Sequence, residues 1–145
     1  MQVDFYQLSR DPAERVIPPL AARVLALGER LLVVSADEGQ LRAIGDALWA
    51  DRPADFLANG LAAEPQAGRQ PILLSGDCSA LNGARMVMFA DGLWRDEGLE
   101  FARAFLLFGE GTLEGARSCW RQLGLREDVE RRFWKQEGGK WREGP

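Results

Sequence analysis

The sequence contains no histidine, the side chain that most often serves as a general base, a nucleophile activator or a metal ligand. Its two cysteines, Cys78 and Cys119, are far apart and form no Cys-x-x-Cys pair, so neither a zinc site nor a redox dithiol is indicated. No segment approaches the ~18 apolar residues of a membrane span, and the N-terminus lacks a basic-then-apolar leader pattern. We therefore expect a cytoplasmic protein with no cofactor, no metal and no membrane partner.

A phosphate-binding loop is also missing, because the chain has no Walker-type Gly-Lys-Ser/Thr segment. Residues 109–115 resemble a dinucleotide fingerprint, but their spacing is G-x-G-x-x-x-G, and Glu110 and Glu114 oppose a bound pyrophosphate. We interpret this segment as a tight turn in which Thr112 caps the following helix. A nucleotide-dependent enzyme is therefore disfavoured.

Acidic side chains follow several expected strands, where open α/β sheets place their ligands. They are Asp37, Glu38, Asp77 and Asp91. A divalent cation could bind there, but without histidine or a recognised acidic motif we favour helix capping for these carboxylates.

The charge is distributed unevenly along the 145 residues. The net charge is −4, yet residues 114–145 carry eight Lys or Arg against six Asp or Glu, and the preceding residues carry ten against sixteen. An acidic body with a mildly basic end argues against broad nucleic-acid binding and leaves room for one local anionic ligand.

Alternating strand and helix patterns predict an α/β fold. We expect a single three-layer Rossmann-like domain over residues 1–145, with a mainly parallel sheet, helices on both faces and a loose end from about residue 137. Asp11-Pro12 is predicted to begin the first helix, and Pro18-Pro19 to break or restart it. The expected strands are 3–8, 31–35, 71–74, 85–90 and 101–108, and the expected helices are 12–28, 38–50, 112–123 and 127–136, with 51–70 irregular.

Two segments have the composition of recognition surfaces. At helical spacing Trp120 and Arg121 share a face with Arg117, and an indole beside two guanidinium groups is typical of a site for an acidic peptide or a phosphate chain. The other segment brings Trp49 and Phe56-Leu57 together near a helix end. It is either a hydrophobic cluster beneath a loop or an apolar surface for a partner helix.

These segments, taken in order along the chain, resemble the chi subunit of the bacterial DNA polymerase III holoenzyme, a clamp-loader accessory protein. The resemblance covers nearly the whole chain. Its elements are Phe5-Tyr6, Leu31-Leu32-Val33-Val34-Ser35, Asp46-Ala47-Leu48-Trp49 with Phe56-Leu57, and Ala116-Arg117-x-x-Trp120-Arg121.

The resemblance implies a non-enzymatic adaptor in DNA replication that contacts DNA only indirectly. It implies that Arg117, Trp120, Arg121 and Phe108 bind the acidic C-terminal tail of single-stranded DNA-binding protein. Trp120 replaces a tyrosine of the family, which keeps an aromatic wall but loses a hydroxyl. Leu113 replaces a basic residue, which is expected to weaken the electrostatic part of binding.

The resemblance also implies a second surface, formed by Trp49, Phe56 and Leu57, that binds the psi subunit of the clamp loader or a repair helicase. Two alternatives remain open from the residues alone. One is a direct single-stranded DNA binder that stacks bases on Trp120, Trp134 and Trp141. The other is a small nucleotide-binding Rossmann-like enzyme with an unusual loop.

Overall fold

The computed structural model describes residues 1–50, 57–137 and 140–144. These residues form a sheet of eight strands in the order β3-β4-β2-β5-β6-β1-β7-β8, parallel except for the β7–β8 pair. The strands are β1 (Gln2–Gln7), β2 (Leu31–Val34), β3 (Asn59–Leu61), β4 (Ile72–Ser75), β5 (Met86–Phe89), β6 (Arg103–Phe108), β7 (Glu130–Glu137) and β8 (Lys140–Glu143).

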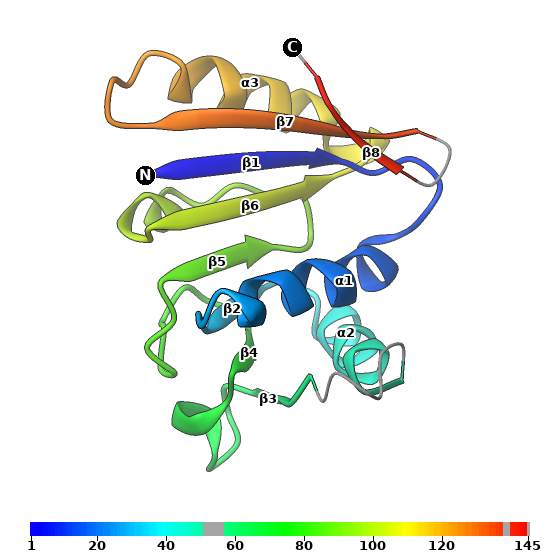
Figure 1. Ribbon diagram of the computed structural model, residues 1–145, viewed down its shortest axis with the longest axis vertical. Helices are drawn as coiled ribbons and strands as arrows, with labels where there is room; N and C mark the ends of the chain where they lie inside the picture. The colour runs from blue at the N-terminus through cyan, green and yellow to red at the C-terminus, as the bar shows by residue number, and fades with distance from the viewer. Residues whose placement is uncertain (51–56, 138–139, 145) are drawn as a thin grey trace.

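Helices cover both faces of this sheet (Figure 1). On one face lie α1 (Ala13–Ala26) and α2 (Glu38–Ala50), and on the other lies α3 (Leu113–Leu123). Each face has its own hydrophobic core, because the inner strands are apolar on both sides: all four residues of β2 are buried. The predicted three-layer α/β fold with a mainly parallel sheet is confirmed.

The chain crosses from β1 to β2 by way of α1, and later strands fill the space between them. β5 and β6 lie between these two strands, and β1 pairs with β6 on one side and β7 on the other. β1 therefore lies within the sheet, beside two strands that come much later in the sequence. Because of this pairing, side chains from the N-terminal strand β1 lie beside side chains from the C-terminal strands β6 and β7.

The helix predicted over residues 127–136 is wrong, since Glu130–Glu137 form β7, parallel to β1. The reason lies in two adjacent aromatic residues, Phe133 and Trp134. On a helix they would point about 100° apart, whereas on a strand they point to opposite faces. Phe133 packs in the core beneath α3, and Trp134 packs in the core beneath α1.

The segment 140–143 near the C-terminus forms a strand. Lys140–Glu143 form β8, which pairs antiparallel with β7 and places Trp141 opposite Gln136. The prediction of a loose end from about residue 137 is wrong for this strand. Its Trp141 packs edge-on against Tyr6, with ring centroids 5.0 Å apart, and this contact holds β8 against the sheet.

The start of α1 differs from the prediction in two ways. Pro12, not Asp11, is the N-cap, and the Asp11 carboxylate accepts a hydrogen bond of 2.8 Å from Gln136 Nε2 of β7. Pro18 and Pro19 lie within a continuous helix. The hydrogen bonds that these prolines cannot form are offset by burial of Ile17 and Leu20 against the sheet. In the segment 57–70, expected to be irregular, Asn59–Leu61 form β3.

Three of the four carboxylates that follow the strands, Asp37, Asp77 and Asp91, accept hydrogen bonds within the protein. Only Asp37 precedes an α-helix, so the predicted helix capping is wrong for Asp77 and Asp91. Asp37 Oδ1 accepts hydrogen bonds from the backbone N–H groups of Gly39 (2.8 Å) and Gln40 (3.2 Å), so the predicted capping by Asp37 is confirmed. Asp77 accepts from the Ser79 N–H at 2.9 Å. Among the described residues, no group of three or more His, Cys, Asp or Glu side chains could hold a metal ion.

Asp91 gives a pH-dependent contribution to stability. Burial of its carboxyl acts to raise its pKa, but hydrogen bonds from Arg95 and from the Ala36 and Leu93 N–H groups outweigh this effect, so the pKa lies below the ordinary 3.8. Because the folded pKa is the lower one, the stabilisation is complete above about pH 4 and is lost as the pH falls through the folded value. We expect Asp91→Asn to flatten the fall in unfolding free energy as the pH is lowered below about 4, measured by urea denaturation. An unchanged slope in this variant would contradict the assignment.

Candidate functional site

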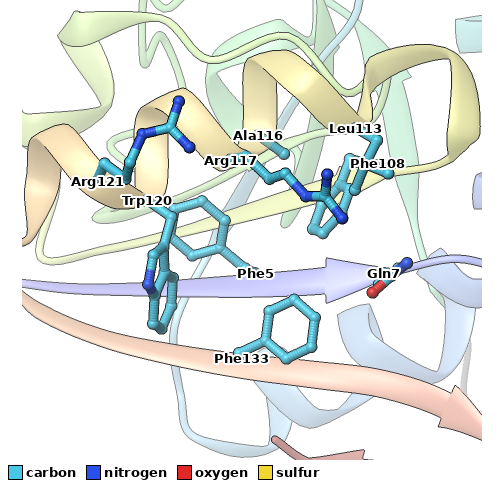
Figure 2. Close-up of a pocket in the computed structure, with 9 residues that line it drawn as sticks. All are labelled: Phe5, Gln7, Phe108, Leu113, Ala116, Arg117, Trp120, Arg121 and Phe133. Carbon is cyan, nitrogen blue, oxygen red and sulfur yellow. The ribbon is translucent and has the colours of Figure 1, made fainter. Parts of the chain in front are cut away.

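A cavity of about 260 Å³ opens between α3 and the strands β1, β6 and β7 (Figure 2). It is called the α3 cavity below. All four residues that the resemblance assigned to the tail-binding site line it. The complete lining is Phe5, Gln7, Phe108, Leu113, Ala116, Arg117, Trp120, Arg121 and Phe133.

Aromatic rings from four elements make up the cavity's inner surface. Phe5 of β1 and Phe108 of β6 are 1% and 3% exposed, so they form the floor. Trp120 of α3 and Phe133 of β7 are partly buried and form the walls. Trp120 stands edge-on to both Phe5 (5.1 Å between centroids) and Phe133 (6.1 Å), a favourable aromatic geometry. An apolar or aromatic side chain of a ligand therefore finds a preformed aromatic pocket.

The rim of the cavity is basic. Arg117 lies at the Phe108 end and Arg121 at the Trp120 end, both on α3 (Figure 2). Arg117 forms an exposed pair with Glu114, with Nη1 and Oε1 3.2 Å apart and side chains 60% and 83% exposed. Such a pair contributes little to stability, so an incoming carboxylate can replace Glu114 at small cost. The arrangement suits a ligand with an apolar end group and a negative charge beside it.

Arg131, the second residue of β7, holds the Trp120 wall from outside the cavity. Its guanidinium lies 4.1 Å from the indole centroid and donates a hydrogen bond of 2.7 Å to the Trp120 carbonyl oxygen. The cation thus stacks on the ring and also satisfies a carbonyl near the C-terminal end of α3, where positive charge is favoured. Arg131 is a positioning residue for the indole.

We expect Arg131→Met to lower the unfolding free energy by about 1–2 kcal/mol, since it removes both contacts but keeps the alkyl packing. Arg132→Met on the same strand is the matched control, because the Arg132 side chain points to the other face and is 45% exposed. Chemical denaturation of both variants measures the difference. Equal stability of the two would show that the Arg131 contact contributes nothing.

Sequence reasoning identified the contributions of α3 and of Phe108 on β6, but it missed those of β1 and β7. Phe133 was missed because its segment was predicted to be helical, and its alternation with Arg131 and Lys135 was the available signal. Phe5 and Gln7 alternate on β1, so they point to one face of the sheet. Leu113, which replaces a basic residue of the family pattern, lines the cavity and makes it more apolar at that point.

The second predicted surface is only partly supported by the geometry. Trp49 is 55% exposed near the end of α2, beside a shallow cavity that it lines together with Leu61 and Glu64. Leu57 is 2% exposed and belongs to the core, so its side chain is not available to a partner, and that part of the prediction is corrected. Phe56 lies outside the described residues.

The three C-terminal tryptophans do not lie on one continuous surface. Trp120 lines the α3 cavity, whereas Trp134 and Trp141 pack on the opposite face of the sheet, against Tyr6. A single strand of nucleic acid cannot stack on all three at once. The alternative of direct DNA binding through these tryptophans loses its geometric basis.

Neither Cys78 nor Cys119 has the properties of a reactive thiol. Burial raises the pKa of the Cys119 thiol to about 12, and burial is also the main cause that raises the pKa of Cys78. Both cysteines are therefore protonated and poor nucleophiles near neutral pH. In the part of the chain that the structure describes, no helix has the length and apolarity that crossing a membrane requires.

Fold and site together define a class: an α/β protein with a mainly parallel sheet and an aromatic surface cavity with a basic rim. The family model described as DNA polymerase III chi subunit, HolC, matches residues 1–127, and the chain belongs to this family of non-catalytic replication accessory subunits. Membership implies association with other subunits of the polymerase holoenzyme. No individual curated protein matches the chain. The family match ends before β7 and β8, which complete the sheet on that side.

Proposed function

We propose that this protein is a cytoplasmic adaptor that binds the acidic C-terminal tail of single-stranded DNA-binding protein in the α3 cavity and a clamp-loader subunit at the Trp49 surface. The proposal of tail binding is supported by one observation: Phe108, Trp120 and Arg117 line the same cavity. Phe108 comes from a different element from the other two, so sequence spacing alone did not require this.

In this proposal the tail's terminal apolar side chain enters the α3 cavity and packs against Trp120, Phe133 and Phe108. Arg117 pairs with the terminal carboxylate or a neighbouring aspartate, leaving its exposed contact with Glu114. Arg121, at the other end of the rim, adds positive field and speeds association. The contacts are few and partly exposed, so we expect micromolar affinity, about −8 kcal/mol.

The experiment is fluorescence anisotropy with a labelled peptide of the tail sequence and a second peptide that lacks its last residue. We expect micromolar binding of the first peptide, at least tenfold weaker binding of the second, and weakening of both as salt increases. Trp49→Arg is the matched control, because it changes an exposed aromatic residue far from the cavity and should leave tail binding intact. Equal binding of both peptides would exclude recognition of the tail's end.

The Trp49 surface is proposed for the psi subunit, or for a repair helicase that uses the same contacts. Its support is a large aromatic side chain 55% exposed at the opposite side of the sheet from the α3 cavity. Exposed aromatic residues of this kind are the usual anchors of protein interfaces. Trp49→Arg is expected to abolish co-purification of such a partner while the tail peptide still binds.

A further inference from the structure

A larger concavity lies on the face of the sheet opposite the α3 cavity, between α1 and β8. Its volume is about 800 Å³, and it is called the α1–β8 groove below. It does not belong to either surface proposed above. Its lining is Tyr6, Leu20, Arg23, Val24, Ala26, Leu27, Arg103, Phe105, Trp134, Lys140 and Trp141.

The groove exists because the helices leave one end of this face uncovered. α1 and α2 pack over the middle of the sheet and its β3 side, and α3 is on the other face (Figure 1). Over β1 and β7 the described residues place no helix; Ser9 and Asp11, which hydrogen-bond to Gln136, lie there with Trp141 of β8, which contacts Tyr6 edge-on. A slot remains between α1 and β8, in a layer that elsewhere in this fold contains helices.

The α1 side of the slot has the pattern of a helix-packing surface. Leu20, Val24 and Leu27 follow one another at four and three residues, so they form one stripe along α1. Leu20 and Val24 are buried against the sheet, whereas Leu27 at the end of the stripe is 62% exposed. A second helix laid beside α1 could therefore bury Leu27, the one member of this stripe that is exposed.

The charges that border the groove have one sign. Its lining includes Arg23, Arg103 and Lys140 and no carboxylate side chain. Arg103 is neutralised by the buried Asp4, 2.6 Å away. Among the described residues, Arg23 and Lys140 form no ion pair, which is notable in a protein of net charge −4. The groove therefore complements an apolar surface flanked by negative charge.

We infer that the α1–β8 groove binds an amphipathic helix of a partner protein, with its apolar side on Leu27 and Trp141 and with Asp or Glu facing Arg23 and Lys140. A nucleic-acid strand fits less well. Trp134 is stacked on Tyr6 at 6.1 Å and donates its indole N–H to Asp4, so the rings already serve internal packing. Two unpaired cations are also few for a phosphate backbone.

The test uses a display library of helical peptides of about 18 residues, with leucine or tryptophan at i, i+3, i+4 and i+7 and Glu, Lys, Gln or Ser elsewhere. Peptides are selected on the wild-type protein and then measured individually against variants. We expect Glu-rich sequences that lose about tenfold in affinity with Leu27→Ser and with Arg23→Gln. The matched controls are Leu125→Ser, an exposed leucine elsewhere, and Arg15→Gln, an exposed arginine of α1 that does not line the groove.

Selected peptides must also keep their affinity for the Trp120→Ala variant, which separates this groove from the α3 cavity. Enrichment of Lys-rich peptides, or equal binding to the Leu27→Ser and Leu125→Ser variants, overturns the inference. So does binding of a labelled oligothymidine that Arg23→Gln releases, since the occupant would then be a nucleic acid. Sedimentation showing a dimer that Leu27→Ser dissociates would identify a second copy instead and likewise overturn it.

Discussion

The Trp120→Ala variant is expected to bind the tail peptide at least thirtyfold more weakly than the wild type. This ring forms one wall of the α3 cavity and packs edge-on against Phe5 and Phe133. Truncating a central aromatic residue of an interface costs about 2 kcal/mol or more, which corresponds to this loss. Anisotropy titrations with the labelled peptide measure it directly.

Two companion variants separate recognition from folding. Trp120→Tyr restores the residue type of the family pattern and should retain affinity within a few-fold, because a ring still fills the wall. The Phe133→Ala variant removes the facing wall and should also weaken binding, although Phe133 is far from α3 in sequence. Thermal melts check that each variant is folded under the assay conditions. A folded Trp120→Ala protein with wild-type affinity would place the tail elsewhere.

The largest expected loss of stability comes from Arg103→Met, which leaves a carboxylate unpaired inside the sheet. Asp4 is 0% exposed, and Arg103 Nε lies 2.6 Å from its Oδ2. Gln2 and Trp134 also donate to this carboxylate, but neither carries a charge. Removing the cation from a buried pair costs about 3–5 kcal/mol, and partial exposure of Arg103 puts the expectation at about 3 kcal/mol.

A double variant tests whether the cost comes from the orphaned charge. Asp4→Leu combined with Arg103→Met replaces both members of the pair with apolar side chains of similar size. We expect this protein to be more stable than Arg103→Met alone, because no buried charge remains. Urea denaturation of the wild type, both single variants and the double variant completes the cycle. If the double variant were less stable than the Arg103→Met protein, packing and not charge would explain the loss.

The elements that sequence patterns predicted well are those whose signal is local. The continuous apolar run at Leu31–Val34 gave β2, and the apolar spacing of Leu41, Ile44 and Leu48 gave α2. The prediction for β7 failed because this strand lies between two hydrophobic cores and gives one aromatic side chain to each of them. A polar strand with one aromatic residue toward each face looks like neither a buried strand nor an amphipathic helix. β3, three residues long, gives almost no periodic signal.

The residues of the candidate site likewise fall into those that local sequence spacing predicts and those that only the sheet pairing brings to the site. Arg117, Trp120 and Arg121 are neighbours on one helix, so their spacing predicts a shared surface. Phe5, Phe133 and Arg131 reach the site only through the pairing of β1 with strands from the far end of the chain. Leu57 shows the converse error. It is close in sequence to the exposed Trp49 and was therefore assigned to the same surface, but its side chain is buried in the core.

The sheet order has a mechanical consequence for the proposed adaptor role. The Trp49 surface lies near β3, at one edge, while the α3 cavity lies over β1 and β7, near the other. Five interstrand steps separate β3 from β1, which at about 4.8 Å each amounts to ~24 Å. A hydrogen-bonded sheet does not stretch as a flexible linker does. If both proposed partners bind, the sheet would keep them at a fixed separation, and the domain would act as a rigid spacer between them.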